Sequence, residues 1–189
     1  MSLTTWLMGT AANDHVVVDA IPRELWLSME QAHVQPLHQA LPQLAYEVAR
    51  ARRYERPLTI AIIRADGVSA EPTVNGHVHL PPLPDTETNS ALVAQSWVSS
   101  ALMTMLIATL LRESLREADI VTYSARFGIC ILALPETDDD GARATVARLQ
   151  ALCLQRLLTS VHGGVAEFSK AGWTIEELLR QAELDSTKP

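Results

Sequence analysis

The chain is poor in cysteine, in aromatic residues and in positive charge. Its 189 residues include 2 cysteines, 5% aromatic residues, and 15 Lys and Arg against 22 Asp and Glu, which gives a net charge of -7. Cys130 and Cys153 lie in apolar runs without the spacing of metal ligands, so we expect two buried free thiols and a cytoplasmic location. The negative charge and the lack of a long Lys/Arg run argue against nucleic acid as a partner.

The amino terminus also lacks the basic residues that precede the apolar stretch of a secretory signal, so we expect no export. What the chain does have is ordinary globular composition, with 48% hydrophobic and 20% charged residues. Its length suits one domain with a short extra segment, and it is sufficient to bury a core.

The chain contains one long apolar run, which could be a membrane span or a buried helix. Residues 91–111 (ALVAQSWVSSALMTMLIATLL) carry no charge and are numerous enough to span a bilayer. A mildly polar stripe recurs along this run at helical spacing, and the run continues directly into the charged segment RESLREAD. We therefore favour a buried or interface-forming helix over a membrane span.

The remaining pattern alternates between strand-like and helix-like segments. β-branched runs predict strands at residues 16–18, 58–63, 120–123 and 128–134, with a last one within 157–168 that Gly163 and Gly164 break. Helical spacing predicts helices at about 22–53, with breaks at Pro36 and Pro42, and at 90–118, 135–154 and from 174 onward. Residues 67–89 are rich in proline and predict a long loop. The order favours an α/β (α+β) fold in which helices flank a mainly antiparallel central sheet.

Several phrases, in this order and spacing, resemble the diguanylate cyclase or GGDEF domain family. The segments that carry the resemblance are ARARRYERPL (49–58), LLRESLREADIV (110–121), LALPETD (132–138), GVAEF (164–168) and TIEELLRQA (174–182). The resemblance covers residues 37–185 and implies a GGDEF/nucleotidyl-cyclase-like fold. It leaves residues 1–36 as an extra N-terminal extension with a short strand and a helical segment.

The catalytic motif of that family is missing. Members join two GTP molecules, and the chemistry needs carboxylates that hold Mg²⁺ against the phosphates. Counting back from Pro135, the five signature positions fall on a stretch without an acid: Arg126, Phe127, Gly128, Ile129 and Cys130. The metal-holding aspartate of the first strand aligns with Arg64, a fixed cation that would repel Mg²⁺. Asp66 matches a second acidic position, but one carboxylate facing an arginine favours a local ion pair or a turn.

One ligand-binding element of the family has a match. Many members bind their product, cyclic di-GMP, at an inhibitory Arg-x-x-Asp motif before the signature, and Arg116 and Asp119 fit this pattern. An arginine fork suits phosphate or a guanine edge. The alternative is structural, because an Arg in the last turn of a helix complements the helix dipole and an Asp at a strand entry can serve the turn.

Other candidate sites are weaker. His77 and His79 form a pair without further metal ligands nearby, so we expect no metal there. The acidic run 138–140 favours capping of a helix over a cation site. We expect a solvated helix end, and no phosphate site, from the four arginines at positions 50, 52, 53 and 56.

These patterns predict a degenerate GGDEF-like domain that is not an enzyme and needs no cofactor or metal. It would act in bacterial signalling as a regulatory or scaffolding module, with a protein partner and as a homodimer through residues 91–111 or the N-terminal helix. The alternative function is a cyclic di-GMP receptor that binds through Arg116 and Asp119. An enzyme with an unrelated site is a third class, which no acid, base and nucleophile set supports.

Overall fold

A computed structural model describes residues 34–66, 87–168 and 174–186, and within the second range it describes side chains from residue 98 onward. Three predicted features fall outside these residues: the strand at 16–18, the start of the first helix and most of the loop at 67–89. The pair His77 and His79 also lies outside them.

The core of the fold is a five-stranded sheet with the order β1-β3-β4-β2-β5. Its strands are β1 (Gln35–Pro36), β2 (Leu58–Ala65), β3 (Ile120–Ser124), β4 (Ile129–Pro135) and β5 (Val161–Glu167). The short β1 pairs with β3 in parallel, and all other neighbours are antiparallel. The prediction of a mainly antiparallel sheet is therefore confirmed.

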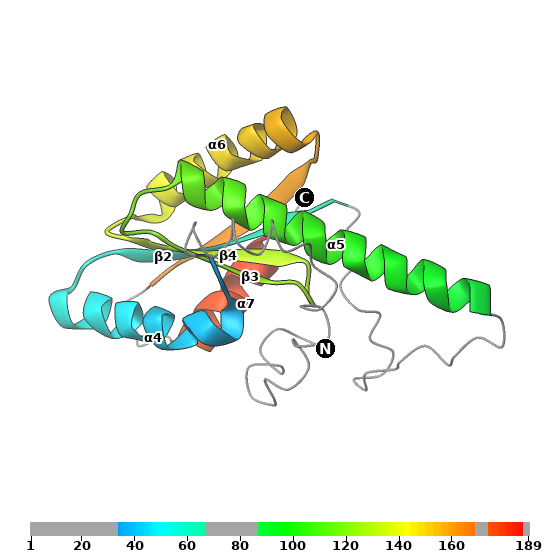
Figure 1. The fold of residues 1–189 in the computed structure, drawn as a ribbon. Coiled ribbons are helices and arrows are strands. Elements are labelled where there is room, and N and C mark those ends of the chain that lie inside the picture. Colours follow the sequence, from blue (N-terminus) through cyan, green and yellow to red (C-terminus); the bar gives the residue numbers. More distant parts are fainter. Residues whose placement is uncertain (1–33, 67–86, 169–173, 187–189) are drawn as a thin grey trace.

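Four helices cover the two faces of the sheet in the part of the chain described. They are α4 (Leu37–Tyr54), α5 (Glu87–Ser114), α6 (Asp139–Leu157) and α7 (Ile175–Ser186). Figure 1 shows α5 and α6 on one face, α4 and α7 on the other, and α5 extending past the sheet. Apolar side chains fill both layers, one against α4 and α7 and one against α5 and α6. Strand β2 is buried on both faces, which explains its uninterrupted apolar sequence.

The first described helix differs from its prediction in one respect. Pro36 precedes α4 in an extended conformation, so the expected break there is confirmed, but Pro42 lies inside the helix without ending it. Leu37 and Leu44, which flank Pro42, are both fully buried against the sheet. We infer that this packing on either side outweighs the one backbone hydrogen bond that a proline removes.

The two glycines of β5 do not break the strand, contrary to the prediction. A Cβ on Gly164 would lie 2.1 Å from the backbone nitrogen of Ser186 and 2.3 Å from the carbonyl oxygen of Ala182, both in α7. A Cβ on Gly163 would lie 2.9 Å from a methyl of Val146 in α6. Helices pack tightly against both faces of this strand, so these two positions have no room for a larger side chain.

Helix α5 starts at Glu87, inside the predicted loop, and ends at Ser114, one turn before the predicted end at 118. Within the described ranges, no helix is long and apolar enough to cross a bilayer. This finding covers α5, the helix that contains the segment 91–111.

Candidate functional site

Three strands bring the aligned catalytic positions to one end of the sheet. In the antiparallel register, Arg64 of β2 lies directly opposite Ile129 of β4. Ile129 in turn lies opposite Ser124 of β3, on the other side of the same strand. The position aligned with the metal-holding aspartate is therefore a direct neighbour of one signature position. At these two positions, this chain carries a guanidinium group and an aliphatic side chain.

Arg64 is directed toward α7 and forms an ion pair there. Its Nη2 lies 3.6 Å from Oε1 of Glu183, and the two side chains are 24% and 28% exposed. The Nε atom of Arg64 is buried and has no hydrogen-bond partner among the described residues. A charge held in this way opposes the approach of a cation to the end of β2.

The β3–β4 turn is closed by apolar packing and offers no carboxylate. Gly128 adopts a φ of 62°, a left-handed conformation that suits glycine, and its N–H donates to the carbonyl of Ala125 at 3.3 Å. Phe127 is buried in the layer beneath α4 and α7, with the Arg126 guanidinium 5.9 Å from its ring centroid. Ile129 and the following Cys130 are each 1% exposed.

Asp66 pairs with a residue that the sequence pattern did not indicate. Its Oδ1 lies 2.8 Å from Nδ1 of His162 in β5, and both side chains are about half exposed. The expectation that Asp66 faces an arginine is wrong, because Arg64 pairs with Glu183 instead. Asp66 lies one residue beyond the end of β2, which ends at Ala65, and its own N–H donates to the carbonyl of Ser160 at 2.9 Å.

The cysteines and acids do not build a metal site in the described ranges. No group of three or more His, Cys, Asp and Glu residues there is arranged to hold an ion. The Cys130 thiol donates to the carbonyl of Thr104 at 3.4 Å, and both cysteines are free and buried. Burial, the largest cause, and the nearby Cys153 thiol raise the pKa of Cys130, and burial raises the pKa of Cys153. Both groups are therefore held as inert thiols.

The Arg-x-x-Asp motif forms a turn between α5 and β3. The Asp119 carboxylate accepts a 2.9 Å hydrogen bond from the backbone N–H of Arg116, and the Asp119 N–H donates back to the Arg116 carbonyl at 3.1 Å. Arg116 lies beyond the last turn of α5, so the proposed interaction of this side chain with the helix dipole does not apply. Arg112 has that role, because its guanidinium donates to the carbonyls of Leu115, Arg116 and Asp119.

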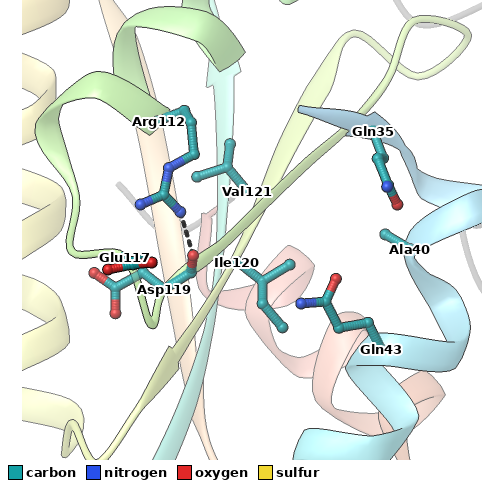
Figure 2. Close-up of a pocket in the computed structure, with 8 residues that line it drawn as sticks. All are labelled: Gln35, Ala40, Gln43, Arg112, Glu117, Asp119, Ile120 and Val121. Atoms are coloured by element: carbon teal, nitrogen blue, oxygen red, sulfur yellow. Dashed lines mark hydrogen bonds between the residues drawn. The ribbon is translucent and has the colours of Figure 1, made fainter. Parts of the chain in front are cut away.

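A small pocket lies on one side of this turn. Figure 2 shows Arg112 reaching the Asp119 carbonyl, with Gln35 and Gln43 of β1 and α4 on the opposite wall. Its volume is about 220 Å³. Because Arg112 is already bonded to backbone carbonyls, this pocket offers no unused cationic group for a ligand.

A larger pocket of about 410 Å³ lies on the other side of the turn and is lined by Arg116, Asp119 and Arg148 of α6. The exposed Arg116 guanidinium pairs with no residue in the described part of the chain, whereas Nη1 of Arg148 donates to the Ser114 carbonyl at 3.2 Å. Sequence reasoning missed Arg148, since no local motif links it to Arg116. The pocket therefore presents two arginines and one carboxylate.

The remaining candidates have structural roles. Asp138 caps α6 by accepting from the Gly141 N–H at 2.9 Å, as predicted for the acidic run. Arg50 and Arg56 both pair with Glu136 at the surface. Two of the four arginines at this end of α4 are thus paired with one acidic residue.

Comparison with known proteins rests on the fold alone. No protein-family model and no curated protein sequence matches this chain. Among solved structures, the active GGEEF domain of a diguanylate cyclase from Vibrio cholerae matches with a TM-score of 0.59 at 12% identity, over 80% of this chain and 88% of that one.

Two further structures are similar. One is the coiled coil and GGDEF domain of DgcB from Caulobacter crescentus in complex with c-di-GMP, with a TM-score of 0.54 at 11% identity, over 80% of this chain and 72% of that one. The other is the diguanylate cyclase SiaD in complex with its activator SiaC from Pseudomonas aeruginosa. It matches with a TM-score of 0.56 at 17% identity, over 86% of this chain and 60% of that one.

These observations define the class of the protein first. It is an α+β domain, with helices on both faces of a mainly antiparallel sheet. Within that class, the chain has the fold of GGDEF domains, as its sequence resemblance predicted.

Proposed function

We propose that this protein is a catalytically inactive GGDEF-like domain that regulates or scaffolds bacterial signalling through protein–protein contacts. The observation that carries the proposal is the register pair of Arg64 and Ile129. The resemblance implies an acid at each of these positions, and this chain has a cation held by Glu183 beside a buried isoleucine. Mg²⁺ bound there would lack its carboxylate ligands and would meet a positive charge.

The closed turn supports the same proposal. Phe127 is packed into the core, so the turn lacks the open glycine backbone that the resemblance implies for close approach of a nucleotide. Three changes of different kinds therefore act against catalysis: a lost carboxylate pair, an added cation and a filled turn. No single substitution would reverse all three.

The test is an assay of purified protein with GTP and Mg²⁺ for cyclic di-GMP. We expect no product, and also no Mg²⁺-dependent GTP binding by calorimetry. Arg64→Ala is the matched variant, since it removes the cation without supplying a carboxylate, and it should remain inactive. Product from either protein would overturn the proposal.

The interaction role is proposed from the loss of chemistry in a retained fold. The similar cyclase SiaD was solved with its activator SiaC, so a protein of this fold can hold a protein partner. We also propose a homodimer and a cytoplasmic location. In the described part of α5, six residues of the charge-free segment are already buried: Ala101, Thr104, Met105, Ile107, Ala108 and Leu111. Among the described side chains of this segment, Leu106, at 41% exposure, is the large apolar one that stays exposed.

A second candidate function is a receptor for cyclic di-GMP, favoured by the 410 Å³ pocket that combines Arg116 with Arg148. This volume is within the ordinary range of ligand sites, and two arginines suit a ligand with two phosphates. The similar domain of DgcB was solved in complex with c-di-GMP. The contrary observation is that the Asp119 carboxylate is already engaged with the Arg116 amide.

Calorimetry with cyclic di-GMP distinguishes the two functions. A receptor would bind at or below tens of micromolar, and Arg116→Ala and Arg148→Ala would each weaken binding. Arg156→Ala is the matched control, because Arg156 is an exposed arginine of α6 outside the pocket. No heat with the unaltered protein, or equal binding by all three variants, would end the receptor hypothesis.

A further inference from the structure

Strand β5 forms one edge of the sheet. It is last in the strand order, and β2 is its neighbour among the described strands. An edge strand carries a row of N–H and C=O groups that another strand could bind, and proteins commonly cover such a row to prevent this. How β5 is covered therefore bears on whether the sheet can be extended by another chain.

Two backbone hydrogen bonds fix which groups of β5 face outward. The N–H of Phe168 donates to the carbonyl of Leu58 at 2.7 Å, and the N–H of Asp66 donates to the carbonyl of Ser160 at 2.9 Å. Bonded residues alternate along an antiparallel pair, so the even-numbered residues of β5 direct their backbone groups toward β2. The odd-numbered residues direct theirs away from the sheet: Val161, Gly163, Val165 and Glu167.

One of these outward groups is bound by a side chain of α7. The N–H of Val165 donates to Oδ2 of Asp185 at 3.1 Å. The same oxygen accepts a hydrogen bond of 3.0 Å from Nη1 of Arg143 in α6. The Asp185 side chain is only 9% exposed, so its carboxylate is held between an amide and a guanidinium with little access to water. Asp185 therefore satisfies this edge amide as the carbonyl of a neighbouring strand would.

The contact crosses the edge of the sheet from one face to the other. Helices α6 and α7 lie on opposite faces (Figure 1), and the pair of Arg143 and Asp185 joins them. Nε of Arg143 also donates to Asp139 at 2.7 Å, and the Asp139 N–H donates to Oε2 of Glu167 at 3.2 Å. These contacts start and end on β5. We call them the clasp, which consists of Val165, Asp185, Arg143, Asp139 and Glu167.

We propose that the clasp closes β5 to the addition of the same strand from a second copy of this chain. The outward groups of β5 are self-complementary when two copies pair antiparallel about Gly163. Gly163 then lies opposite its own counterpart, and Val165 lies opposite Val161 of the second copy. In that pairing the Val165 N–H donates to the Val161 carbonyl, but the clasp already holds this N–H on Asp185. The clasp and the strand pairing therefore exclude each other.

The clasp is thus an autoinhibitory contact that acts on self-association. It goes beyond the proposed function, because that function concerns partners of the folded domain, whereas the clasp decides whether the sheet itself can be extended. It also lies apart from α5, the helix to which the sequence assigned a homodimer.

Amide hydrogen exchange followed by NMR measures the clasp directly. In the unaltered protein the Val165 amide should be protected, although it faces outward. Asp185→Ala should speed its exchange by about 10-fold or more. The Ala166 amide faces β2 and should stay protected, so it serves as the internal control. An unprotected Val165 amide in the unaltered protein, or the same exchange rate after Asp185→Ala, would overturn the proposal.

Sedimentation across a range of concentrations tests the consequence for association. Asp185→Ala should associate more strongly than the unaltered protein, by about 10-fold or more in the association constant. The Gly163 amide should gain protection in the associated species, because it binds its counterpart there. Asp140→Ala, at an exposed acid of α6 outside the clasp, is the matched control and should associate like the unaltered protein. Equal association by the two variants, or an unprotected Gly163 amide in the associated species, would overturn the proposal.

Asp185→Asn distinguishes an open clasp from the loss of α7. Asparagine keeps an oxygen for the Val165 N–H but loses the charge that binds Arg143, so Val165 should exchange at a rate between those of the unaltered protein and Asp185→Ala. If Asp185→Ala also deprotects Ala166, this variant decides. An intermediate rate with Ala166 protected supports the clasp, and an unchanged rate overturns it. None of these measurements involves GTP, so the clasp and the proposed function fail separately.

Discussion

Gly164 is the position at which the packing of α7 can be tested most sharply. The substitution Gly164→Ala adds one methyl group where β5 and α7 are in closest contact. The new Cβ would lie 2.1 Å from the Ser186 nitrogen, 2.3 Å from the Ala182 carbonyl oxygen and 2.7 Å from the carbonyl carbon of Asp185. All three are backbone atoms, so no side-chain rotation relieves the contact.

The size of the effect follows from what has to move. Ordinary contacts of a Cβ are about 3.4 Å or longer, so α7 must shift by roughly 1 Å or the strand must bend. Overpacking costs about 1–3 kcal/mol, and backbone contacts belong at the upper end. The reduced freedom of the unfolded chain returns about 0.4–1 kcal/mol. We expect a net loss of about 2 kcal/mol in the free energy of unfolding.

Urea denaturation followed by circular dichroism measures this loss. Gly141→Ala is the matched control, because its Cβ would meet the side chains of Asp138 and Thr137 at 3.0 and 3.2 Å, and these can adjust. It should change stability by less than about 1 kcal/mol. If Gly164→Ala left stability unchanged or raised it, α7 would not pack on β5 as described, and the Arg64–Glu183 pair that α7 provides would lose its basis.

Three further predictions concern local features. Asp138→Ala should lower the free energy of unfolding by about 1 kcal/mol, because it removes the cap of α6. The control Asp140→Ala, at an exposed site, should change it by less than about 0.5 kcal/mol. Equal losses for the two variants in urea denaturation would refute the capping role of Asp138. Asp119→Ala should cost about 1–3 kcal/mol without any ligand present, since it leaves the amide it binds unsatisfied, and an unchanged melting curve would contradict the turn. Cys130 and Cys153 should react with a thiol reagent at pH 8 only after unfolding, because burial raises the pKa of both and keeps the thiols protonated; fast reaction of the native protein would count against it.

Local patterns predicted the elements of the fold well. The β-branched run of β2 indicated a strand covered on both faces, and it is buried along nearly its whole length. Thr174 and Glu177, at the expected start of the last helix, bind each other's backbone N–H groups at 3.3 and 2.8 Å in a capping box. Such features depend on residues that are close in the sequence, which a single chain reveals.

Features that depend on distant residues were missed or misjudged. The sequence predicted a break in the strand at Gly163 and Gly164. Only the packed helices reveal that the strand continues there and has no space for side chains. The contact of His162 with Asp66 depends on the register of β2 and β5. Arg148 joins Arg116 in one pocket only once α6 is packed on the sheet. For the candidate site, the assignment of aligned positions stays a prediction from the sequence, and the structure supplies the neighbours of those residues.

The central claim is our proposal that this chain makes no cyclic di-GMP, because the resemblance aligns Arg64 with the metal-holding aspartate and the signature positions 126–130 carry no acid. The most direct measurement is chromatographic detection of cyclic di-GMP after prolonged incubation of the purified protein with GTP and Mg²⁺, beside an active GGDEF domain as the positive control. The account predicts product from the control and none from this protein. Cyclic di-GMP formed by this protein, and abolished when Mg²⁺ is removed, would contradict it.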